Sequence, residues 1–172
     1  AALQDVGAKL GKLTQGADRA WELLFFHNPA AVQVWLATQA WATEPTEHNG
    51  LRVTLYGLAA GDPVTKTLDV NFGDALTLQR AEVSTPAPKP GDLLRVSTDW
   101  FVHAPAPEYK FSLRLTDSAG SLIHSVDYVP QNWFAPTSVW VVGQPARDQR
   151  GLLLPADLPP GRYALTLRLY DP

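Results

Sequence analysis

The stretch that most constrains the fold is residues 152–170, where an apolar run, a proline-rich turn and an alternating segment follow one another. Two adjacent prolines fix backbone dihedrals just before Gly161, which supplies a conformation that other residues avoid. From Tyr163 to Leu169, large apolar side chains recur at every second position, as in a strand with one buried side. A lone strand or hairpin is barely stable in water, so this strand needs a second apolar layer. The stretch therefore predicts the last strand of a β-sandwich.

The chain after about residue 60 carries short strand-like runs separated by proline and glycine, without helical periodicity. About seven strands at such spacing favour an antiparallel β-sandwich, immunoglobulin-like or jelly-roll-like. The turn residues 117–120 predict a hairpin between the runs at 111–115 and 122–126. The expected strands span residues 75–83, 93–101, 109–116, 122–128, 139–142, 152–154 and 162–170.

The first 60 residues have a different pattern, which predicts helix, strand, helix and strand in that order. Apolar residues spaced three and four apart predict a first helix that ends near Gly16. The continuous apolar run 21–26 indicates a buried strand, and residues 29–43 have the periodicity of a second helix. Alternation over residues 51–56 predicts a second strand. Because two strands make a poor sheet, we interpret this part as the remnant of an upstream α/β unit.

A segment with glycine and proline at 59–63 marks the expected boundary. We therefore divide the chain into an α/β remnant at residues 1–60 and an antiparallel β-sandwich at residues 61–172. The chain contains no methionine, so we expect it to be a piece of a longer protein. The absence of cysteine excludes disulfides, thiolate metal sites and cysteine nucleophiles.

Charge and hydropathy exclude two further classes. The net charge is −3 and the basic residues are scattered, so no nucleic-acid partner is expected. Residues 23–43 carry no charge, but His27, Asn28 and Pro29 interrupt them. A membrane-spanning helix needs about 20 mainly apolar residues in a row, so we expect no span and also find no signal-peptide pattern.

No catalytic signature is present, and we expect neither catalytic residues nor a cofactor. The histidines lie outside metal-ligand spacing of one another, although His103 is close enough in sequence to Asp99 for a pair. Ser118 and Ser121 lie in the expected hairpin turn and not in a nucleophile elbow. The four histidines are His27, His48, His103 and His124.

A weak candidate metal loop contains Asp69, Asn71 and Asp74 beside Gly73. Calcium prefers such oxygen-bearing side chains, but the spacing does not match an EF-hand. Asp, Asn and Gly are also ordinary turn residues, so the plain turn remains the alternative.

The tryptophans of the β part are the most suggestive residues. Flat aromatic faces stack on sugar rings, so Trp133, Trp140 and Trp100 are candidate ligand contacts. Trp133 lies in the proline-rich loop 130–136, where burial is harder to guarantee. The alternative is that these rings fill the sandwich core, as large aromatics commonly do.

Several motifs resemble those of a known family. Residues 21–27 and 51–56 resemble the end of the soluble region in bacterial multi-pass membrane glycosyltransferases of the dolichyl-phosphate-mannose–protein mannosyltransferase-like class. Some of these proteins continue into a C-terminal β-domain; this chain departs from its pattern at residues 141–144. The matching features are residues 71–74, 89–92, Trp100, 111–117, Gly120, 136–140, 154–163 and 169–172.

The resemblance implies a non-catalytic accessory domain on the extracytoplasmic face of the cell membrane. The family's catalytic acid lies between early membrane helices that this chain lacks, so no catalytic residue is carried over. The domain would be attached to its parent membrane glycosyltransferase domain and would hold a glycan or a protein acceptor. A structural or protein-interaction sandwich without ligand is the alternative. A free-standing hydrolase is a third reading, against which the missing nucleophile argues.

Overall fold

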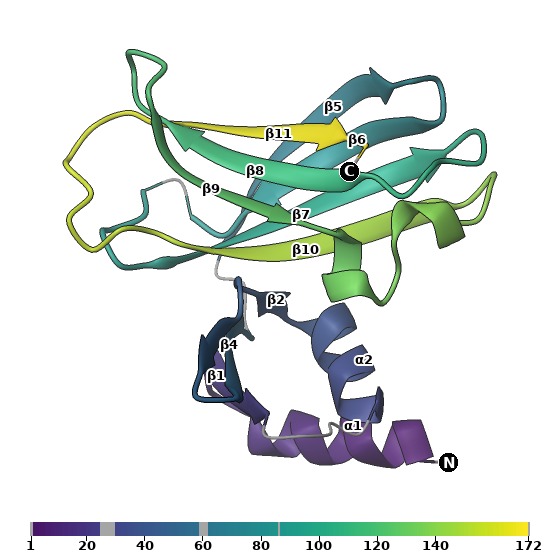
Figure 1. Cartoon of the computed structure of the whole chain (residues 1–172), viewed down its shortest axis with the longest axis vertical. Helices are drawn as coiled ribbons and strands as arrows, with labels where there is room; N and C mark the ends of the chain where they lie inside the picture. The colour runs from purple at the N-terminus through teal and green to yellow at the C-terminus, as the bar shows by residue number, and fades with distance from the viewer. Residues whose placement is uncertain (1, 25–29, 59–61, 86, 172) are drawn as a thin grey trace.

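Alternating apolar residues in the C-terminal two thirds of the chain form two stacked β-sheets, and a small α/β part lies at one side of them (Figure 1). The computed structural model describes residues 2–24, 30–58, 62–85 and 87–171. The structure is mainly β with two helices near the N-terminus, which confirms the expected fold class. The helices are α1 (Ala2–Leu13) and α2 (Ala30–Gln39), with single turns η1 (Pro130–Trp133) and η2 (Thr137–Val139). The strands are β1 (Arg19–Leu24), β2 (Trp41–Ala42), β3 (Thr46–His48), β4 (Leu51–Gly57), β5 (Val64–Phe72), β6 (Leu76–Val83), β7 (Leu93–Val102), β8 (Lys110–Thr116), β9 (Leu122–Tyr128), β10 (Pro145–Leu153) and β11 (Ala164–Tyr170).

The larger sheet has the strand order β1-β4-β2-β10-β7-β6-β5, with β3 paired to β4, and the smaller sheet has the order β11-β8-β9. β8 and β9 pair antiparallel across the turn at 117–120, which confirms the expected hairpin. β11 pairs with β8 at the edge of the smaller sheet, so the C-terminal alternation is indeed the last strand of the sandwich.

The sandwich core is centred on Trp100, a fully buried residue of β7. Its ring lies 5.2 Å from that of Phe111 on β8, between centroids, and 5.3 Å from that of Phe72 on β5. These contacts join the inner sides of both sheets. Tilted aromatic pairs of this kind stabilise a core by about 0.5–1.5 kcal/mol each beyond area burial. Leu76, Val102 and Leu152 are among the other side chains of the core that are fully buried.

Three strand expectations after residue 60 were wrong. The expected strand at 152–154 covers only the end of β10, which begins at Pro145. Residues 139–142 do not form a strand, because η2 ends there and Val141 and Val142 lie exposed in a turn closed at Gly143, which has φ +78°. Strand β5 was not expected. Most of its side chains are polar and exposed, so burial imposes no apolar alternation on its sequence.

The strand expected at 21–26 is present as β1, but the prediction that it is buried was wrong. β1 lies at the edge of the larger sheet, and Trp21 and Leu23 are 63% and 56% exposed. The opposite side of the strand carries Glu22, which is partly buried. Residues 25 and 26 lie outside the described residues.

The strands of the α/β part continue the larger sheet instead of forming a separate one. Residues Ala42 of β2 and Arg150 of β10 pair in parallel, and β2 also pairs with β4. This parallel junction connects the first 60 residues to the sandwich. The division at 59–63 stays a prediction, since residues 59–61 lie outside the described residues.

We predict that Gly151→Ala destabilises this junction. A Cβ atom at Gly151 would lie 2.7 Å from the Trp41 carbonyl oxygen and 3.1 Å from Leu93 Cδ1. We expect the free energy of unfolding to fall by about 1–3 kcal/mol, as overpacking commonly does. Urea unfolding monitored by circular dichroism measures this. The control is Gly11→Ala, because a Cβ at Gly11 meets no atom within 4 Å. Equal unfolding free energies for the two variants would contradict the close contact.

Candidate functional site

A polar pocket of about 300 Å³ lies where the α/β part meets η1. Its volume is at the lower end of the range of small-molecule sites, about 300–1,000 Å³. Strands β1 and β4 supply hydrogen-bonding side chains to this pocket, and the segment at η1 supplies the rings of Trp133 and Phe134. The lining comprises Glu22, Leu24, Gln33, Thr43, Pro45, Arg52, Thr54, Tyr56, Asn132, Trp133 and Phe134.

The polar wall follows from the pairing of β1 with β4. Glu22 is the partner of Thr54, and Leu24 is the partner of Arg52. Partner residues in an antiparallel pair point to the same side, and side chains two apart on a strand do so too. Tyr56 therefore points the same way as Arg52 and Thr54. One alternating strand thus supplies a cation and two hydroxyls to a single side.

Tyr56 orients the carboxylate of this wall. Its hydroxyl donates a hydrogen bond to Glu22 Oε2 at 2.9 Å. Burial, and then the charge of Glu22, raise the pKa of Tyr56 well above its usual range. At neutral pH Tyr56 is therefore a neutral donor that holds a charged acceptor in place.

The aromatic wall is carried by an unusual backbone. Gln131, Asn132 and Trp133 have φ of 50°, 51° and 72°, so three consecutive non-glycine residues lie in the left-handed region. Each such residue costs roughly 1–2 kcal/mol. Strained backbone of this kind persists only where surrounding contacts hold it, and it clusters at functional sites.

Buried charges of β10 hold the η1 backbone. Asp148, 1% exposed, accepts hydrogen bonds from the Gln131 N–H at 2.9 Å and from the Tyr128 hydroxyl at 2.8 Å. Arg150, 3% exposed, donates from Nη1 to Asn132 Oδ1 at 2.8 Å, and its guanidinium lies 4.6 Å from the Tyr128 ring centroid. The left-handed turn is therefore attached to the sandwich through two side chains of one strand.

Burial shapes the electrostatics of this anchor. It raises the pKa of the Asp148 carboxyl and, in the opposite direction for a cation, lowers the pKa of the Arg150 guanidinium. It also raises the pKa of Tyr128 well above its ordinary value. Buried charges must be paired or hydrogen-bonded, and both groups contact Tyr128. Asp148 accepts a hydrogen bond from its hydroxyl, and the Arg150 guanidinium lies over its ring.

The structure separates the three candidate tryptophans. Trp133 is 61% exposed and lines the pocket. Trp100 is 0% exposed, and its indole N–H donates to Thr98 Oγ1 at 2.9 Å, so it packs in the core and reaches no surface ligand. Trp140 is partly buried 6.1 Å from the Trp100 ring, between centroids, and its N–H donates to the Ala135 carbonyl. Only Trp133 remains placed for ligand contact.

Turn geometry accounts for the candidate metal loop. Asn71 Nδ2 donates to Asp74 Oδ1, and the Asp74 N–H donates to Asn71 Oδ1, both at 2.8 Å, across the β5–β6 turn. Asp69 lies on β5 itself. Within the described parts of the chain, no three His, Cys, Asp or Glu residues gather in a way that would hold a metal.

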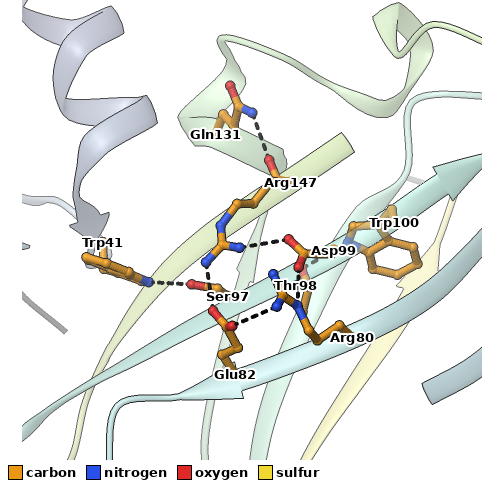
Figure 2. A network of polar contacts seen from close by, with 9 residues as sticks. All are labelled: Trp41, Arg80, Glu82, Ser97, Thr98, Asp99, Trp100, Gln131 and Arg147. Atoms are coloured by element: carbon orange, nitrogen blue, oxygen red, sulfur yellow. Dashed lines mark hydrogen bonds and ion pairs between the residues drawn. The ribbon is translucent and has the colours of Figure 1, made fainter. Parts of the chain in front are cut away.

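The suggested pair of His103 with Asp99 is wrong. Figure 2 shows Asp99 between two arginines on the outer side of the larger sheet, with Arg80 Nε at 2.6 Å and Arg147 Nη1 at 3.0 Å. Glu82 closes this network through Arg147 Nη2 at 2.8 Å. His103 Nε2 instead lies 2.9 Å from Thr77 Oγ1. His27 lies outside the described residues.

Sequence reasoning missed the polar wall and the buried anchor. The alternation of Arg52, Thr54 and Tyr56 was a detectable signal for one side of a strand. Asp148 and Arg150 also stand two apart, which places both on one side of any strand. Nothing in the sequence indicated that the turn held by Asp148 and Arg150 lines the same pocket as the polar side of β4.

Comparison with known proteins gives no family. No protein-family model matches the chain, and no curated protein matches it either. Among the described residues, no helix is long and apolar enough to cross a membrane. Fold and site together define a mainly β protein with one carboxylate, one guanidinium, amides, hydroxyls and three aromatic rings among the described residues around a small pocket.

Proposed function

We propose that this chain is a non-catalytic glycan-binding domain and that the pocket beside η1 is its site. The observation that supports this most is the position of Trp133. Its side chain is 61% exposed at a polar pocket, and it lies in a backbone segment in the left-handed region that buried side chains of β10 hold in place. Backbone strain of this kind is typical of functional sites, and we therefore infer that the exposed indole of Trp133 contacts a ligand.

The chemistry of the pocket matches that of a sugar. A pyranose ring has an apolar side, which stacks on an aromatic ring, and an edge of hydroxyls that both donate and accept hydrogen bonds. Glu22 accepts, Arg52 donates, and Gln33 and Asn132 do both. No histidine and no second carboxylate are present in the described lining, so an acid–base pair is lacking and binding is the better-supported role.

The proposal extends to the setting of the domain. The motif resemblance supports an accessory domain that holds a glycan or protein acceptor for a parent membrane glycosyltransferase-like protein on the extracytoplasmic side. Sequencing the complete reading frame tests this context directly. Several hydrophobic spans upstream of Ala1 would support it, whereas a complete frame without any would contradict the membrane setting but leave glycan binding open.

We predict that Trp133→Ala weakens glycan binding about 10- to 100-fold, as removal of an aromatic anchor commonly does. The side chain is largely exposed, so stability should change little. A glycan array identifies the ligand, and titration calorimetry measures both proteins. The matched control is Trp21→Ala, whose side chain is 63% exposed and outside the pocket lining. Absence of any glycan signal for the unmutated domain would reject the proposal.

A protein-interaction module is the second candidate, favoured by Trp21 and Leu23 on the edge strand β1. Edge strands with exposed apolar side chains are available for pairing with another chain. If the unmutated domain binds no glycan, this reading predicts that Leu23→Lys abolishes binding of a protein partner while Trp133→Ala preserves it.

A further inference from the structure

We propose a second ligand site, independent of the glycan pocket, which takes an aliphatic carboxylate of the fatty-acid type. It is an apolar cavity of about 630 Å³ at the end of the sandwich, between the two sheets. The segment 87–92, which leads into β7, and the turn 154–163 lie there, at the left end of the sandwich in Figure 1. Because the second turn crosses from β10 to β11, it spans the gap between the larger and the smaller sheet.

Core leucines form the floor of this cavity. Leu94 comes from the larger sheet, Leu115 comes from the smaller one, and Leu154 directly follows β10; each is at most 5% exposed. The cavity opens to solvent on the side of its exposed lining residues, and its lining is mainly apolar. It therefore has the character of a small-molecule site, which is concave and mostly apolar.

The walls of the cavity are apolar and stiff. Prolines from both turns line it, including Pro88 and Pro159, and proline carries no backbone N–H to hydrogen-bond a ligand. The two turns are joined by hydrogen bonds from the Gly91 N–H to the Pro155 carbonyl at 3.2 Å and from the Leu154 N–H to the Asp92 carbonyl at 2.9 Å. Because the turns are already held together, they lose less conformational entropy when a ligand binds.

Tyr163 closes one side of the cavity. Its hydroxyl donates to the Pro159 carbonyl at 2.6 Å, so its hydrogen-bonding group is already used within the turn. The aromatic ring is the part of this residue that remains for the cavity, and it adds to the apolar wall.

The charge of the lining identifies the head group of the ligand. Lys89 and Arg162 are its only charged members among the described residues, and both are exposed. Neither forms an ion pair within the described chain. The nearest carboxylate in sequence, that of Asp92, accepts from the Lys89 backbone N–H at 2.7 Å and so serves the turn. Two unpaired cations beside an apolar cavity fit an apolar chain that ends in an anion.

The test is titration calorimetry of the whole chain with octanoate, decanoate and dodecanoate, each below its micelle concentration. We expect affinity to rise roughly fourfold for each added methylene until the cavity is full. Decanol, which lacks the charge, should bind at least about tenfold more weakly than decanoate. Absence of binding, or an affinity that does not depend on chain length, would overturn the proposal.

Variants locate the site. The double variant Lys89→Gln/Arg162→Gln should lose about tenfold in affinity for decanoate. Its control, Lys66→Gln/Arg168→Gln, makes the same charge change at exposed positions outside the cavity and should bind normally. Ala87→Trp, at an exposed position of the lining, should block entry. Equal affinity in both double variants would overturn the proposal, and Trp133→Ala should leave decanoate binding unchanged because it tests the glycan pocket alone.

Discussion

Replacement of Asp148 by alanine should lower the free energy of unfolding by about 3–5 kcal/mol, the usual result of leaving a buried charge uncompensated. The carboxylate is 1% exposed and accepts from the Gln131 N–H and the Tyr128 hydroxyl. Its removal leaves both donors without their partner and takes away a negative charge that acts on the buried guanidinium of Arg150. Urea unfolding of the purified domain measures the loss.

Two comparison variants separate the buried anchor from charge in general. Asp148→Asn keeps the side-chain volume and one acceptor oxygen but also removes the charge, so its loss of stability should be smaller than that of Asp148→Ala and still clear. Glycan affinity should fall as well, because the Gln131 backbone is held less firmly. Asp99→Ala removes a carboxylate from the network at the sheet surface (Figure 2) and should lose much less stability than Asp148→Ala, since such pairs are partly solvated. An Asp148→Ala variant as stable as Asp99→Ala would show that Asp148 does not anchor η1.

Replacement of Trp100 by alanine should lower the free energy of unfolding by about 3–5 kcal/mol, because a large cavity opens at the centre of the core. The ring contacts Phe72, Phe111 and Trp140 at centroid distances of 5.3, 5.2 and 6.1 Å. For a chain of this size the expected decrease in melting temperature is roughly 6–20 °C. Calorimetric or circular-dichroism melts measure it.

Trp133→Ala is the matched control for Trp100→Ala, because it removes the same side chain from an exposed position. Its melting temperature should remain close to that of the unmutated domain. Trp100→Phe keeps an aromatic ring at this position, so its melting temperature should lie between those of the two alanine variants. Similar melting temperatures for Trp100→Ala and Trp133→Ala would contradict the division into a packing and a ligand-contacting tryptophan.

Strands with one buried side were predictable from sequence. β7, β8, β9 and β11 were expected close to their observed bounds, because their inward positions must be apolar while their outward positions need not be. β5 escaped prediction since it is mostly exposed at a sheet edge. The valines at 139–142 gave the opposite error. They predicted a strand because they are apolar, but they lie exposed outside both sheets.

The candidate site was predictable only in part. A proline-rich loop with an aromatic residue pointed to Trp133, but Trp100 and Trp133 look alike in sequence although one is 0% and the other 61% exposed. Whether an aromatic side chain is buried depends on which strands cover it. That information lies in contacts between residues far apart in the chain.

The amino-acid sequence by itself determined the local features of this protein: the two helices, most of the strands, the turns and the β class, since each depends on neighbouring residues. Only the tertiary structure decided that β2 joins β10, that Asp148 holds the left-handed turn, and that Glu22 and Trp133 line the same pocket. The physical reason is that a pocket is made by side chains brought together through strand pairing. Turn residues reveal the pairing of neighbouring strands such as β8 and β9, but pairing between strands far apart in the sequence leaves no mark in the local pattern of either strand.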